Sequence, residues 1–454
     1  MPRLLQLTPL ALALVMTGCA LNPPASPEPV KLPAQYLAQA SEADAASASV
    51  VNWWSRYQDP ELLRLIGLAN AHNQDIAVSL SQYDKALAVL GATRSNELPS
   101  LTVKAGSTRE STNTANKRDR SSTHSASGLA SFELDMWGRL SNATKANAQT
   151  AEAAREYSRH TQNLIRNAVI QQYWSIRQLD ALGEVIAKQI EARRQQLTIS
   201  EQKLAFGVTS ELDVQQAKAD LASLERSRIS TKTSREGYQQ SLAILVGIPD
   251  LTLSAGTGIA EPLMAPTMGL PSLLLQQRPD IKQAENQLQA AGFDVAVARA
   301  ALFPSIGLSA QGGGRSASLS SLTGAGSSFW TLGYTLDLPL FDGGLRLSQV
   351  DQAKAAQREV AALYQKTILT AFADVNQALI ETEGWNKQTP WMQDELSAAQ
   401  KAMDFALRKY AVGTVDYSTV LDTQKSLLDA EKSSVEIRYG KLISQANLYY
   451  ALGF

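Results

Sequence analysis

The sequence predicts an α+β membrane protein in which strands from several copies of one chain form a β-barrel and very long helices continue that barrel. Three observations predict this fold class. The chain of 454 residues repeats itself internally, two long proline-poor segments are typical of helices, and each repeat holds two short segments of alternating polarity.

The two halves of the chain share one pattern. The stretch NQDIAVSLSQYDKALAVLGATRSNELPSL (73–101) aligns with RPDIKQAENQLQAAGFDVAVARAALFPSI (278–306) at a constant offset of 205. Further matches follow in the same order: 130–140 with 332–345, and 206–225 with 412–431. Each half therefore reads helix, strand, polar loop, strand, very long helix, tight turn, helix, which predicts a protomer with an internal pseudo-twofold repeat.

Two segments are predicted to be rods. Residues 141–206 contain no proline and one interior glycine, Gly183, and are rich in good helix formers. About 65 residues at about 1.5 Å each give a length of roughly 100 Å. The partner, 345–412, spaces apolar residues at threes and fours as a coiled coil does: Val360, Leu363, Phe372, Val375 and Leu379. Because such a stripe must lie against other helices, we expect the rods to pack together in an assembly.

Pro390 lies inside the second rod, in KQTPWMQ. A proline within a helix removes one hydrogen bond and bends the helix. We expect one continuous helix, bent near 386–390, with Trp385 and Trp391 packed beside the bend. The alternative is two helices with a break between them.

Each half contains two strand candidates of about 9 to 11 residues, the length of a tilted membrane-spanning strand. Their apolar faces are Leu101, Val103 and Ala105; Ala130, Phe132, Leu134 and Met136; Ile306, Leu308 and Ala310; and Leu332, Tyr334, Leu336 and Leu338. One apolar and one polar face fit a barrel with lipid outside and water inside. Polar loops are expected at 107–126 and 312–328. The alternative is a soluble antiparallel sheet with one wet face.

A proline stands where helix gives way to strand in both halves. In RSNELPSLTVKAG (94–106) and RAALFPSIGLSAQ (299–311), the alternation begins directly after Pro99 and Pro304, with one residue between helix and strand. A proline suits the start of a strand because it has no N–H to donate. We expect each junction to mark the change from a helix in water to a strand in the membrane, with aromatic residues of the interface nearby: Trp137, Phe303, Trp330 and Phe341.

Four strands cannot close a barrel, and open edges are not tolerated in lipid. Two, three or four copies supply 8, 12 or 16 strands, and an eight-stranded barrel is filled by its own side chains, whereas larger ones leave a lumen. The helices are expected to continue that lumen as a helical tube.

The N-terminus is predicted to be a targeting segment rather than part of the fold. A single positive charge, Arg3, precedes an apolar run over 4–16 that ends at MTGCA, where Cys19 is the only cysteine. Small residues before a lone cysteine resemble a bacterial lipoprotein signal, with 1–18 removed and Cys19 as the lipid attachment site. By the same resemblance, Ala20 rather than aspartate after the cysteine favours sorting to the outer membrane. The alternative is an ordinary signal peptide cut nearby, with an incidental cysteine.

Composition excludes several classes of protein. The formal net charge of -1 gives no basic surface for nucleic acid. One cysteine cannot form an internal disulfide, and no run of about 18 apolar residues follows the signal, so a membrane crossing must use strands. His72, His124 and His160 are scattered without metal-ligand spacing, and neither a nucleophile elbow nor a phosphate loop occurs. We therefore expect no catalytic residue, cofactor or metal site.

Together these features resemble the outer-membrane factors of tripartite efflux systems, the TolC-type family, in its lipid-anchored drug and metal efflux branch. The motifs are WWSRYQDPELLRLIGLANAHNQDI (53–76), ELDMWGRL (133–140), QRPDIKQAENQLQAA (277–291), ARAALFPSIGL (298–308) and YSTVLDTQKSL (417–427), and the match covers nearly all of the mature chain. The resemblance implies a homotrimer with a 12-stranded barrel in outer-membrane lipid. It also implies a periplasmic helical barrel of about 100 Å, a mixed equatorial zone, and docking to a periplasmic membrane-fusion adaptor and an inner-membrane pump of the RND type.

The predicted division of the chain follows the repeat and the resemblance. Between the halves, four prolines and several glycines predict an extended connection. The segments are 1–18, the lipoprotein signal peptide; 19–59, an N-terminal anchor and equatorial segment; 60–246, the first repeat; 247–271, the inter-repeat equatorial linker; and 272–454, the second repeat.

Two tight turns, AFGVTSE (205–211) and AVGTVDY (411–417), lie at the far ends of the rods, where glycine lets the backbone reverse. In the family such tips receive the adaptor, which assigns docking to four residues: Gly207, Val208, Gly413 and Thr414. The alternative, that the glycines only make turns, is compatible with this role.

The helix after each tip carries aspartates, and in a threefold assembly an inward aspartate becomes a ring of three that attracts cations. The resemblance makes Asp422 the constriction of a periplasmic gate, with Lys409 and Tyr410 as links that hold it shut. Asp213 is a further candidate, but like Asp416 it has an alternative role in the chemistry of a helix start. Ser418 stands where many relatives have a bulkier apolar residue, which puts a dewetted seal at that level in doubt.

The function implied is a passive exit duct for small toxic compounds such as drugs or metal ions. Two alternatives stay open: a structural or adhesive trimeric coiled-coil lipoprotein without transport, and a duct that secretes a polypeptide.

Overall fold

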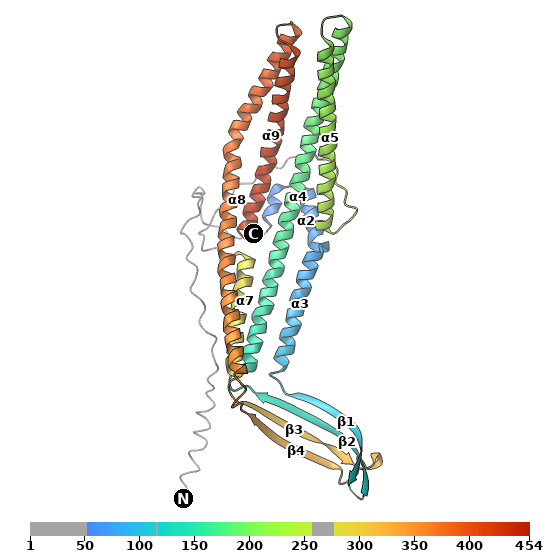
Figure 1. The fold of residues 1–454 in the computed structure, drawn as a ribbon, viewed down its shortest axis with the longest axis vertical. Helices are drawn as coiled ribbons and strands as arrows, with labels where there is room; N and C mark the ends of the chain where they lie inside the picture. The colour runs from blue at the N-terminus through green and yellow to red at the C-terminus, as the bar shows by residue number, and fades with distance from the viewer. Residues whose placement is uncertain (1–51, 115–116, 257–276) are drawn as a thin grey trace. The chain divides into compact units, whose positions relative to one another are not determined.

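The computed structural model describes residues 52–114, 117–256 and 277–454. The elements in chain order are η1 (Trp53–Tyr57), α2 (Pro60–His72), α3 (Gln74–Ser95), β1 (Ser100–Thr114), β2 (Lys117–Leu134), α4 (Arg139–Ala205), α5 (Glu211–Val246), α7 (Pro279–Ala300), β3 (Ser305–Ser316), η3 (Leu319–Ser321), β4 (Ser328–Asp337), α8 (Leu345–Ala411) and α9 (Tyr417–Ala451) (Figure 1). The signal peptide, Cys19 and most of the predicted linker lie outside the described residues.

The described residues form two compact units. The sheet unit consists of residues within 81–156 and 282–367, and the helical unit of 52–80, 157–256, 277–281 and 368–454. The four strands belong to the first unit, and the hairpin turns at 205–211 and 411–417 belong to the second.

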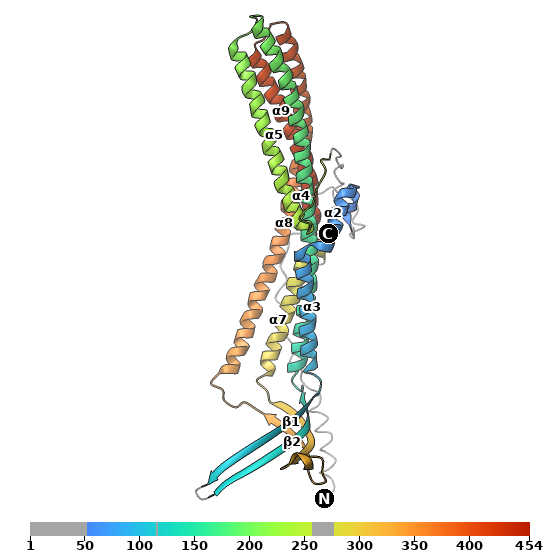
Figure 2. The ribbon, with the colours of Figure 1, turned by 90° about the vertical axis from the view of Figure 1, so that its right-hand side faces the viewer.

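The sheet is antiparallel, in the order β1-β2-β3-β4 (Figure 2). Its register aligns the predicted apolar faces in rows across the strands: Leu101, Ala130, Ala310 and Leu332 in one row, and Phe132, Leu308 and Tyr334 in the next. Residues opposite one another in a ladder share a face. The apolar side chains therefore lie on one face of the sheet, as the alternation predicts.

Both predicted loops are partly wrong. Residues 107–114 and 117–126 are the paired ends of β1 and β2, which reach 15 and 18 residues. β3 continues to Ser316, so the loop expected at 312–328 begins only after it. A ladder is held by backbone hydrogen bonds, and a hairpin rich in Ser and Thr can continue it where no apolar face is required. Polar composition alone is therefore a poor sign of a loop in this sheet.

The helix–strand junctions are longer than expected. Four residues, rather than one, separate α3 from β1 (96–99) and α7 from β3 (301–304). Each connection ends in the predicted proline, directly before the first residue of the strand. At the other ends, Met136 and Leu338 lie just beyond β2 and β4.

The long helices agree closely with the predicted rods. α4 and α8 each contain 67 residues and are therefore each about 100 Å long. An aspartate a few residues before each helix bonds to its first turn. Asp135 accepts hydrogen bonds from the N–H groups of Leu140 and Ser141 at 3.0 and 2.8 Å, and Asp342 accepts one from the N–H of Arg346 at 3.2 Å. These bonds satisfy N–H groups that a helix start leaves without partners.

α8 continues through Pro390 without a break, as predicted. Trp385 packs against Gly440 of α9, where a Cβ would lie 2.8 Å from the indole ring. The expected packing of Trp391 is wrong for the single chain, because this side chain is 75% exposed. Leu363, assigned to the apolar stripe of the rod, is exposed as well.

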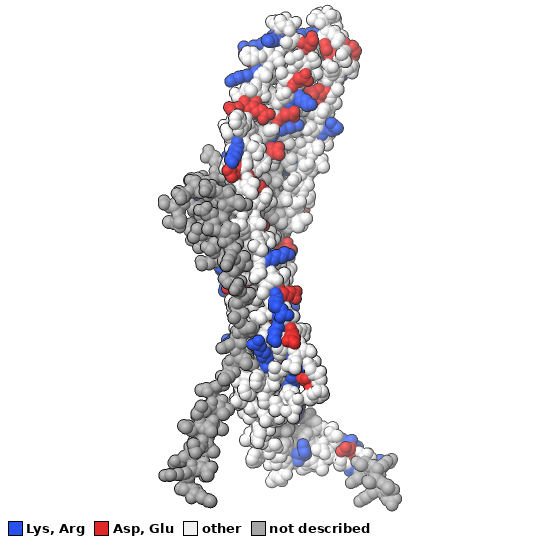
Figure 3. Space-filling view, turned by 60° about the vertical axis from the view of Figure 1, so that its left-hand side comes forward, with Lys and Arg blue, Asp and Glu red and all other residues white. Residues whose placement is uncertain are grey.

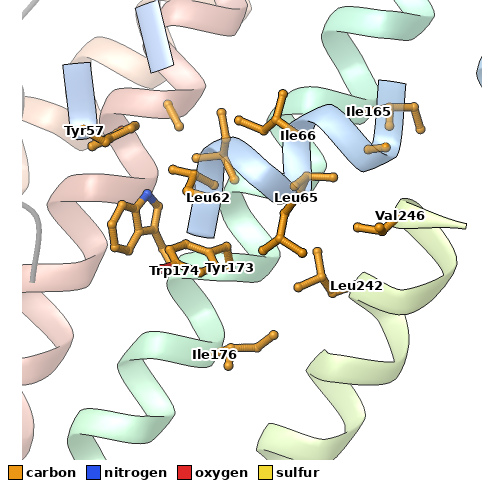
Figure 4. Packing of buried hydrophobic residues seen from close by; sticks show 14 of the residues in the cluster. Tyr57, Leu62, Leu65, Ile66, Ile165, Tyr173, Trp174, Ile176, Leu242 and Val246 are labelled. Carbon is orange, nitrogen blue, oxygen red and sulfur yellow. The ribbon is translucent and has the colours of Figure 1, made fainter. Parts of the chain in front are cut away.

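The core of the helical unit lies where α2 meets α4 and α5 (Figure 4). Its members include buried side chains from these three helices: Leu62, Leu65 and Ile66 of α2, Tyr173 and Trp174 of α4, and Leu242 and Val246 of α5. From η1, Trp53 stacks on Tyr449 of α9 with ring centroids 4.4 Å apart, and Tyr57 donates to the carbonyl of Leu442 at 3.1 Å. The N-terminal segment is therefore fastened to both repeats.

The described start of the linker, residues 247–256, belongs to no helix or strand, and a buried ion network holds it. Asp180 accepts from Arg177 at 3.1 Å and from Arg235 at 2.5 Å. The two guanidinium groups also donate to backbone carbonyls, Arg177 to Ser254 at 2.8 Å and Arg235 to Leu253 at 2.9 Å. Charge-assisted hydrogen bonds thus satisfy carbonyl groups of a segment that belongs to no helix or sheet.

The first repeat is closed where α5 ends against the start of α3. Asn73 donates from its amide to the carbonyl of Leu245 at 2.8 Å. Gly247 ends α5 with φ +74°, and a Cβ on it would lie 2.4 Å from the carbonyl oxygen of His72. Only glycine fits this left-handed position, because the backbone of another segment occupies the space of a side chain.

The second repeat is closed in the same manner where α9 ends. Arg278, which aligns with Asn73 at the offset of 205, donates to the carbonyl of Ala451 at 2.9 Å. Gly453 has φ +92°, and a Cβ on it would lie 3.0 Å from the Arg278 side chain. Arg278 also forms ion pairs with Asp280 at 2.7 Å and Asp374 at 3.1 Å. The pseudo-twofold repeat therefore extends to the contacts that end each half.

Candidate functional site

The two hairpin turns lie at the same end of the helical unit (Figures 1 and 2). Both use one motif: Gly207 and Gly413 have φ +70° and +76°, and the N–H groups of Val208 and Thr414 bond to the carbonyls of Lys203 and Lys409, each at 2.9 Å. This is the Schellman ending of a helix, in which a left-handed glycine reverses the chain. A Cβ added to either glycine would meet no atom outside its turn within 4 Å, so only the backbone angle requires glycine there.

The turns expose apolar side chains. Phe206 is 82% exposed, Val208 72% and Val412 74%. Phe206 and Val208 belong to the first turn and Val412 to the second, and none of the three joins a buried cluster of the described chain. Of the four predicted docking residues, Val208 belongs to this apolar group, and the hydroxyl of Thr414 is bound to the carbonyl of Lys409 at 3.0 Å.

Tyr410, predicted as a gate link, lies just before the second turn between two partners. Its ring centroid is 5.6 Å from that of Tyr417 on α9. The ammonium group of Lys203, from α4, lies 4.1 Å from the same ring, a cation–π contact. Burial raises the pKa of Tyr417 to about 12, so this neighbouring phenol is neutral at physiological pH. Tyr410 thus joins α4, α8 and α9 next to the turns.

Asp213 is at the third position of α5 and forms a capping box with Ser210. Its carboxylate accepts from the hydroxyl of Thr209 and from the N–H of Ser210 at 3.4 Å, while its own N–H donates to Ser210 Oγ at 3.3 Å. The helix-start role is therefore realised at Asp213. Asp416 occupies the N-cap of α9 without a capping bond from its side chain.

Asp422, Ser418 and Lys409 are exposed in the single chain. Asp422 lies on α9, one and a half turns beyond Tyr417, and its carbonyl accepts from Ser426 at 3.0 Å. The structure thus brings Tyr410 against α9 near these residues, and it leaves the carboxylate of Asp422 on the surface.

A buried charged layer beneath the turns has no counterpart in the sequence predictions. Arg193 of α4, 3% exposed, forms an ion pair with Asp220 of α5. An apolar cluster lies on each side of it: Ile186, Ile190, Leu224 and Leu428 on one, and Ala217, Tyr417 and Val420 on the other. Because a buried charge is costly without its partner, this pair disfavours arrangements of α4 and α5 that separate the two groups. The signal was available, because Arg193 interrupts the apolar spacing of α4.

The second helix–strand junction is tied to its neighbours in the sheet unit. The indole of Trp137 donates to the carbonyl of Pro304 at 2.7 Å and stacks on Phe303, with ring centroids 4.9 Å apart. Arg346, at the start of α8, donates to the carbonyl of Ala301 at 2.6 Å. The predicted interfacial aromatics Trp330 and Phe341 are 81% and 92% exposed.

Within residues 52–114, 117–256 and 277–454, no group of three or more His, Cys, Asp or Glu side chains is placed to hold a metal ion. No helix in that part of the chain is both long and apolar enough to span a membrane.

The sequence matches the family model of outer membrane efflux proteins over 65–248 and 270–454. The chain belongs to the outer membrane efflux protein family. It is 31% identical to the pyoverdine export outer membrane protein OpmQ of Pseudomonas aeruginosa, over 97% of this chain and 94% of that one. It is 30% identical to the cation efflux system protein CusC of Escherichia coli, over 99% and 98%. The predicted family and the predicted outer-membrane location are confirmed.

Solved structures have the same fold. A crystal structure of CusC superposes with a TM-score of 0.87 at 26% identity, covering 95% of this chain and 99% of that one. The CmeC outer membrane channel of Campylobacter jejuni superposes with a TM-score of 0.90 at 24% identity, covering 96% and 95%. The predicted fold class is confirmed by this likeness to outer-membrane channels. Members of the family are efflux channels rather than enzymes.

Proposed function

We propose that three copies of this chain form the outer-membrane exit duct of a tripartite efflux pump, which passively conducts small toxic compounds such as drugs or metal ions out of the cell. The observation that carries the proposal is the open sheet. β1 and β4 are its edges, and Leu101 and Leu332 on them are each 76% exposed on one apolar face. In lipid every strand edge needs a partner, so the edges of neighbouring copies must pair. Three copies supply twelve strands, enough to surround a lumen.

The names of the relatives support an efflux role and several kinds of cargo. They include outer membrane proteins for pyoverdine export, an antibiotic efflux pump, a toluene efflux pump and a cation efflux system. Their sequence identities to this chain are similar, so the cargo is assigned only to the class of small toxic compounds. In our proposal an inner-membrane pump of the RND type selects it, and a periplasmic membrane-fusion adaptor connects pump and duct.

Conductance tests the duct. Purified full-length protein in planar lipid bilayers is expected to give stable ion-conducting steps. A structural or adhesive lipoprotein predicts no conductance, and that result would overturn the proposal. A deletion strain separates the remaining alternative: greater sensitivity to drugs, dyes or metal salts supports small-molecule efflux, whereas loss of a secreted polypeptide alone supports a protein duct.

We assign the docking of the adaptor to the two turns, through Gly207, Val208, Gly413 and Thr414. The exposed apolar side chains at 206, 208 and 412 support this role, since they form no part of the cores of the described chain. The equal height of the two turns would offer six similar tips to the adaptor in a trimer.

The gate is assigned to Asp422, Tyr410 and Lys409, with Ser418 and Asp213 beside them. Asp422→Ala and Tyr410→Ala are each expected to raise single-channel conductance in planar bilayers. The first removes the side chains that form the proposed constriction, and the second removes the ring that joins α8 to α4 and α9. Asp422→Ala is also expected to reduce cation selectivity, seen as a shift of the reversal potential in a salt gradient.

Asp84→Ala is the control for the gate, because Asp84 is an exposed aspartate on α3, far along the chain from either turn. It is expected to conduct as the wild type does. Unchanged conductance in both gate variants would remove the gate from these residues while leaving the duct in place.

We also propose that Cys19 carries the lipid anchor. Cys19→Ala is expected to abolish the incorporation of labelled palmitate, because the chain has no other cysteine and lipoprotein processing requires the thiol. Labelling of the variant at the wild-type level would show that the cysteine is incidental.

A further inference from the structure

α5 and α8 each carry a second stripe of residues at alternating spacings of three and four. On α5 the stripe is Gln215, Ala219, Ala222, Arg226 and Ile229, and on α8 it is Trp391, Glu395, Ala398, Ala402 and Phe405. Every one of these residues is exposed in the single chain. Their spacing is that of a coiled-coil seam, which fits packing against another helix.

The stripes lie on different sides of their helices from the residues that face the chain's own core. On α5 the buried positions are Val214, Ala217 and Leu224. On α8, Met403 and Tyr410 pack against the cluster around Tyr417. Single exposed apolar residues are ordinary on a protein surface. Ile229 and Trp391, whose side chains are 63% and 75% exposed, differ because each belongs to a regularly spaced stripe that also contains two alanines.

α5 and α8 are the edges of the helical unit. α5 packs on α4, where Arg194 donates to Glu225 at 2.6 Å, and α4 packs on α9, where Gln189 donates to Glu431 at 2.8 Å. α8 in turn packs on α9 through Trp385. The helices follow one another as α8, α9, α4 and α5 across the view (Figure 1). In a ring of identical copies related by rotation, one edge of each copy meets the other edge of the next.

The register across such an edge is set by the turns. Both turns lie at one end of the helical unit, and rotation about an axis along the rods keeps them level. α5 begins at Glu211 and α8 ends at Ala411, and the two run in opposite directions. Each step away from the turn on α5 is therefore matched by one step back along α8.

Counted from Glu211 and Ala411, the two members of each pair agree in their distance from the turn to within two residues, so this register pairs the two stripes in order. Ala219 falls opposite Ala402, and Ala222 opposite Ala398, so that two layers of small side chains allow close approach. Next, Arg226 falls opposite Glu395, with opposite charges. Ile229 then falls opposite Trp391, an apolar pair in which the otherwise exposed indole is covered. On the face that Figure 3 draws, acidic and basic side chains are mixed along the helical unit.

We propose that α5 of one copy packs antiparallel against α8 of the next copy through these two stripes, with Ala219 on Ala402 and Ile229 on Trp391. The proposal rests on the trimeric duct and specifies the surface that closes its helical part. It also accounts for the exposure of Trp391 beside Pro390, because this side chain belongs to the seam between copies.

A double cysteine variant, Ala219→Cys with Ala402→Cys, tests the seam in the full-length protein. Mild oxidation of membranes is expected to convert most chains into disulfide-linked trimers on a non-reducing gel, because the alanine layers bring the two backbones closest. Each single cysteine variant is a control for disulfides that involve Cys19 and for disulfides between two copies of α5 or two copies of α8. Both single variants are expected to stay unlinked. Ala219→Cys with Gln400→Cys is the matched control, since Gln400 is exposed on another side of α8.

Charge exchange gives a second measurement. Arg226→Glu and Glu395→Arg are each expected to lower the temperature at which the trimer dissociates in detergent, and the double variant is expected to recover it, because only the double variant restores opposite charges. A wild-type protein that is trimeric and conducts, yet neither links at 219 and 402 nor shows recovery, would overturn the seam and leave the duct standing. A wild-type protein that is not trimeric would overturn both.

Discussion

Arg278→Ala is expected to destabilise the helical unit by about 3–5 kcal/mol, the effect of removing one partner from a buried ion pair. The side chain of Arg278 is 5% exposed and neutralises both Asp280 and Asp374. It also donates to the carbonyl of Ala451, which holds the end of α9. Alanine would leave both carboxylates without this guanidinium partner and would free the C-terminal end of the second repeat.

The midpoint of thermal unfolding in detergent, followed by far-UV circular dichroism, measures this effect. Arg64→Ala is the matched control. Arg64 pairs with Glu61 at 2.6 Å, but its side chain is 47% exposed, so its loss is expected to cost no more than about 0.5 kcal/mol. Equal midpoints for the two variants would contradict a structural role for the buried cluster.

Acid provides an independent check of the same cluster. Burial raises the pKa of Asp280. The hydrogen bonds and charge of Arg278, together with the charge of His160, lower it by more than burial raises it, so the pKa lies below its usual value. A carboxyl with a depressed pKa in the folded state adds stability above its unfolded-state pKa of about 4, and that stability is lost as the pH falls through the folded-state pKa. The wild type is therefore expected to lose more stability than Arg278→Ala below about pH 4.

The predictable part of the fold came from periodicity and repetition. The extent of α4 follows from the absence of proline and glycine between 141 and 206, Gly183 apart, because a helix continues until a residue ends it. The predicted start of α8 at Leu345 agrees with the structure. The faces of the strands follow from alternation at period two. The lengths of β1 and β2 could not be inferred, because Ser and Thr support a hairpin as readily as a loop and the pairing partner decides between them.

The two turns were predicted in position, but most of the contacts around them were not. The glycines at 207 and 413 indicate turns by themselves, since a left-handed residue must end each helix there. The helix-start role of Asp213 was available from the sequence as an alternative, because a carboxylate favours the first turn of a helix. The Arg193–Asp220 pair and the contact of Lys203 with Tyr410 were not, because they join residues from different helices. Arg278 shows the same limit: the alignment places it opposite Asn73, yet only the structure shows that an amide and a guanidinium close the two repeats in one manner.

Gly247→Ala is expected to destabilise the helical unit by about 2–5 kcal/mol, from two separate costs. A left-handed backbone costs a residue with a Cβ about 1–2 kcal/mol, and the overlap of that Cβ with fixed neighbours costs about 1–3 kcal/mol more. The overlap is severe, because the Cβ would lie 2.4 Å from the oxygen and 2.8 Å from the carbon of the His72 carbonyl, which are backbone atoms. Relief requires α5 to move away from the start of α3 and breaks the bond between Asn73 and Leu245.

Gly413→Ala separates the two costs, because Gly413 has nearly the same φ, +76° against +74°, with no atom outside its own turn within 4 Å of the Cβ position. This variant is expected to lose only the backbone part, about 1–2 kcal/mol. Thermal unfolding of both variants beside the wild type measures the difference, which is the effect of the His72 carbonyl alone. If alanine at 247 cost no more stability than alanine at 413, the close approach of Gly247 to the His72 carbonyl would not be the reason that this position requires glycine. The same explanation for Gly453 beside Arg278 would then fail too.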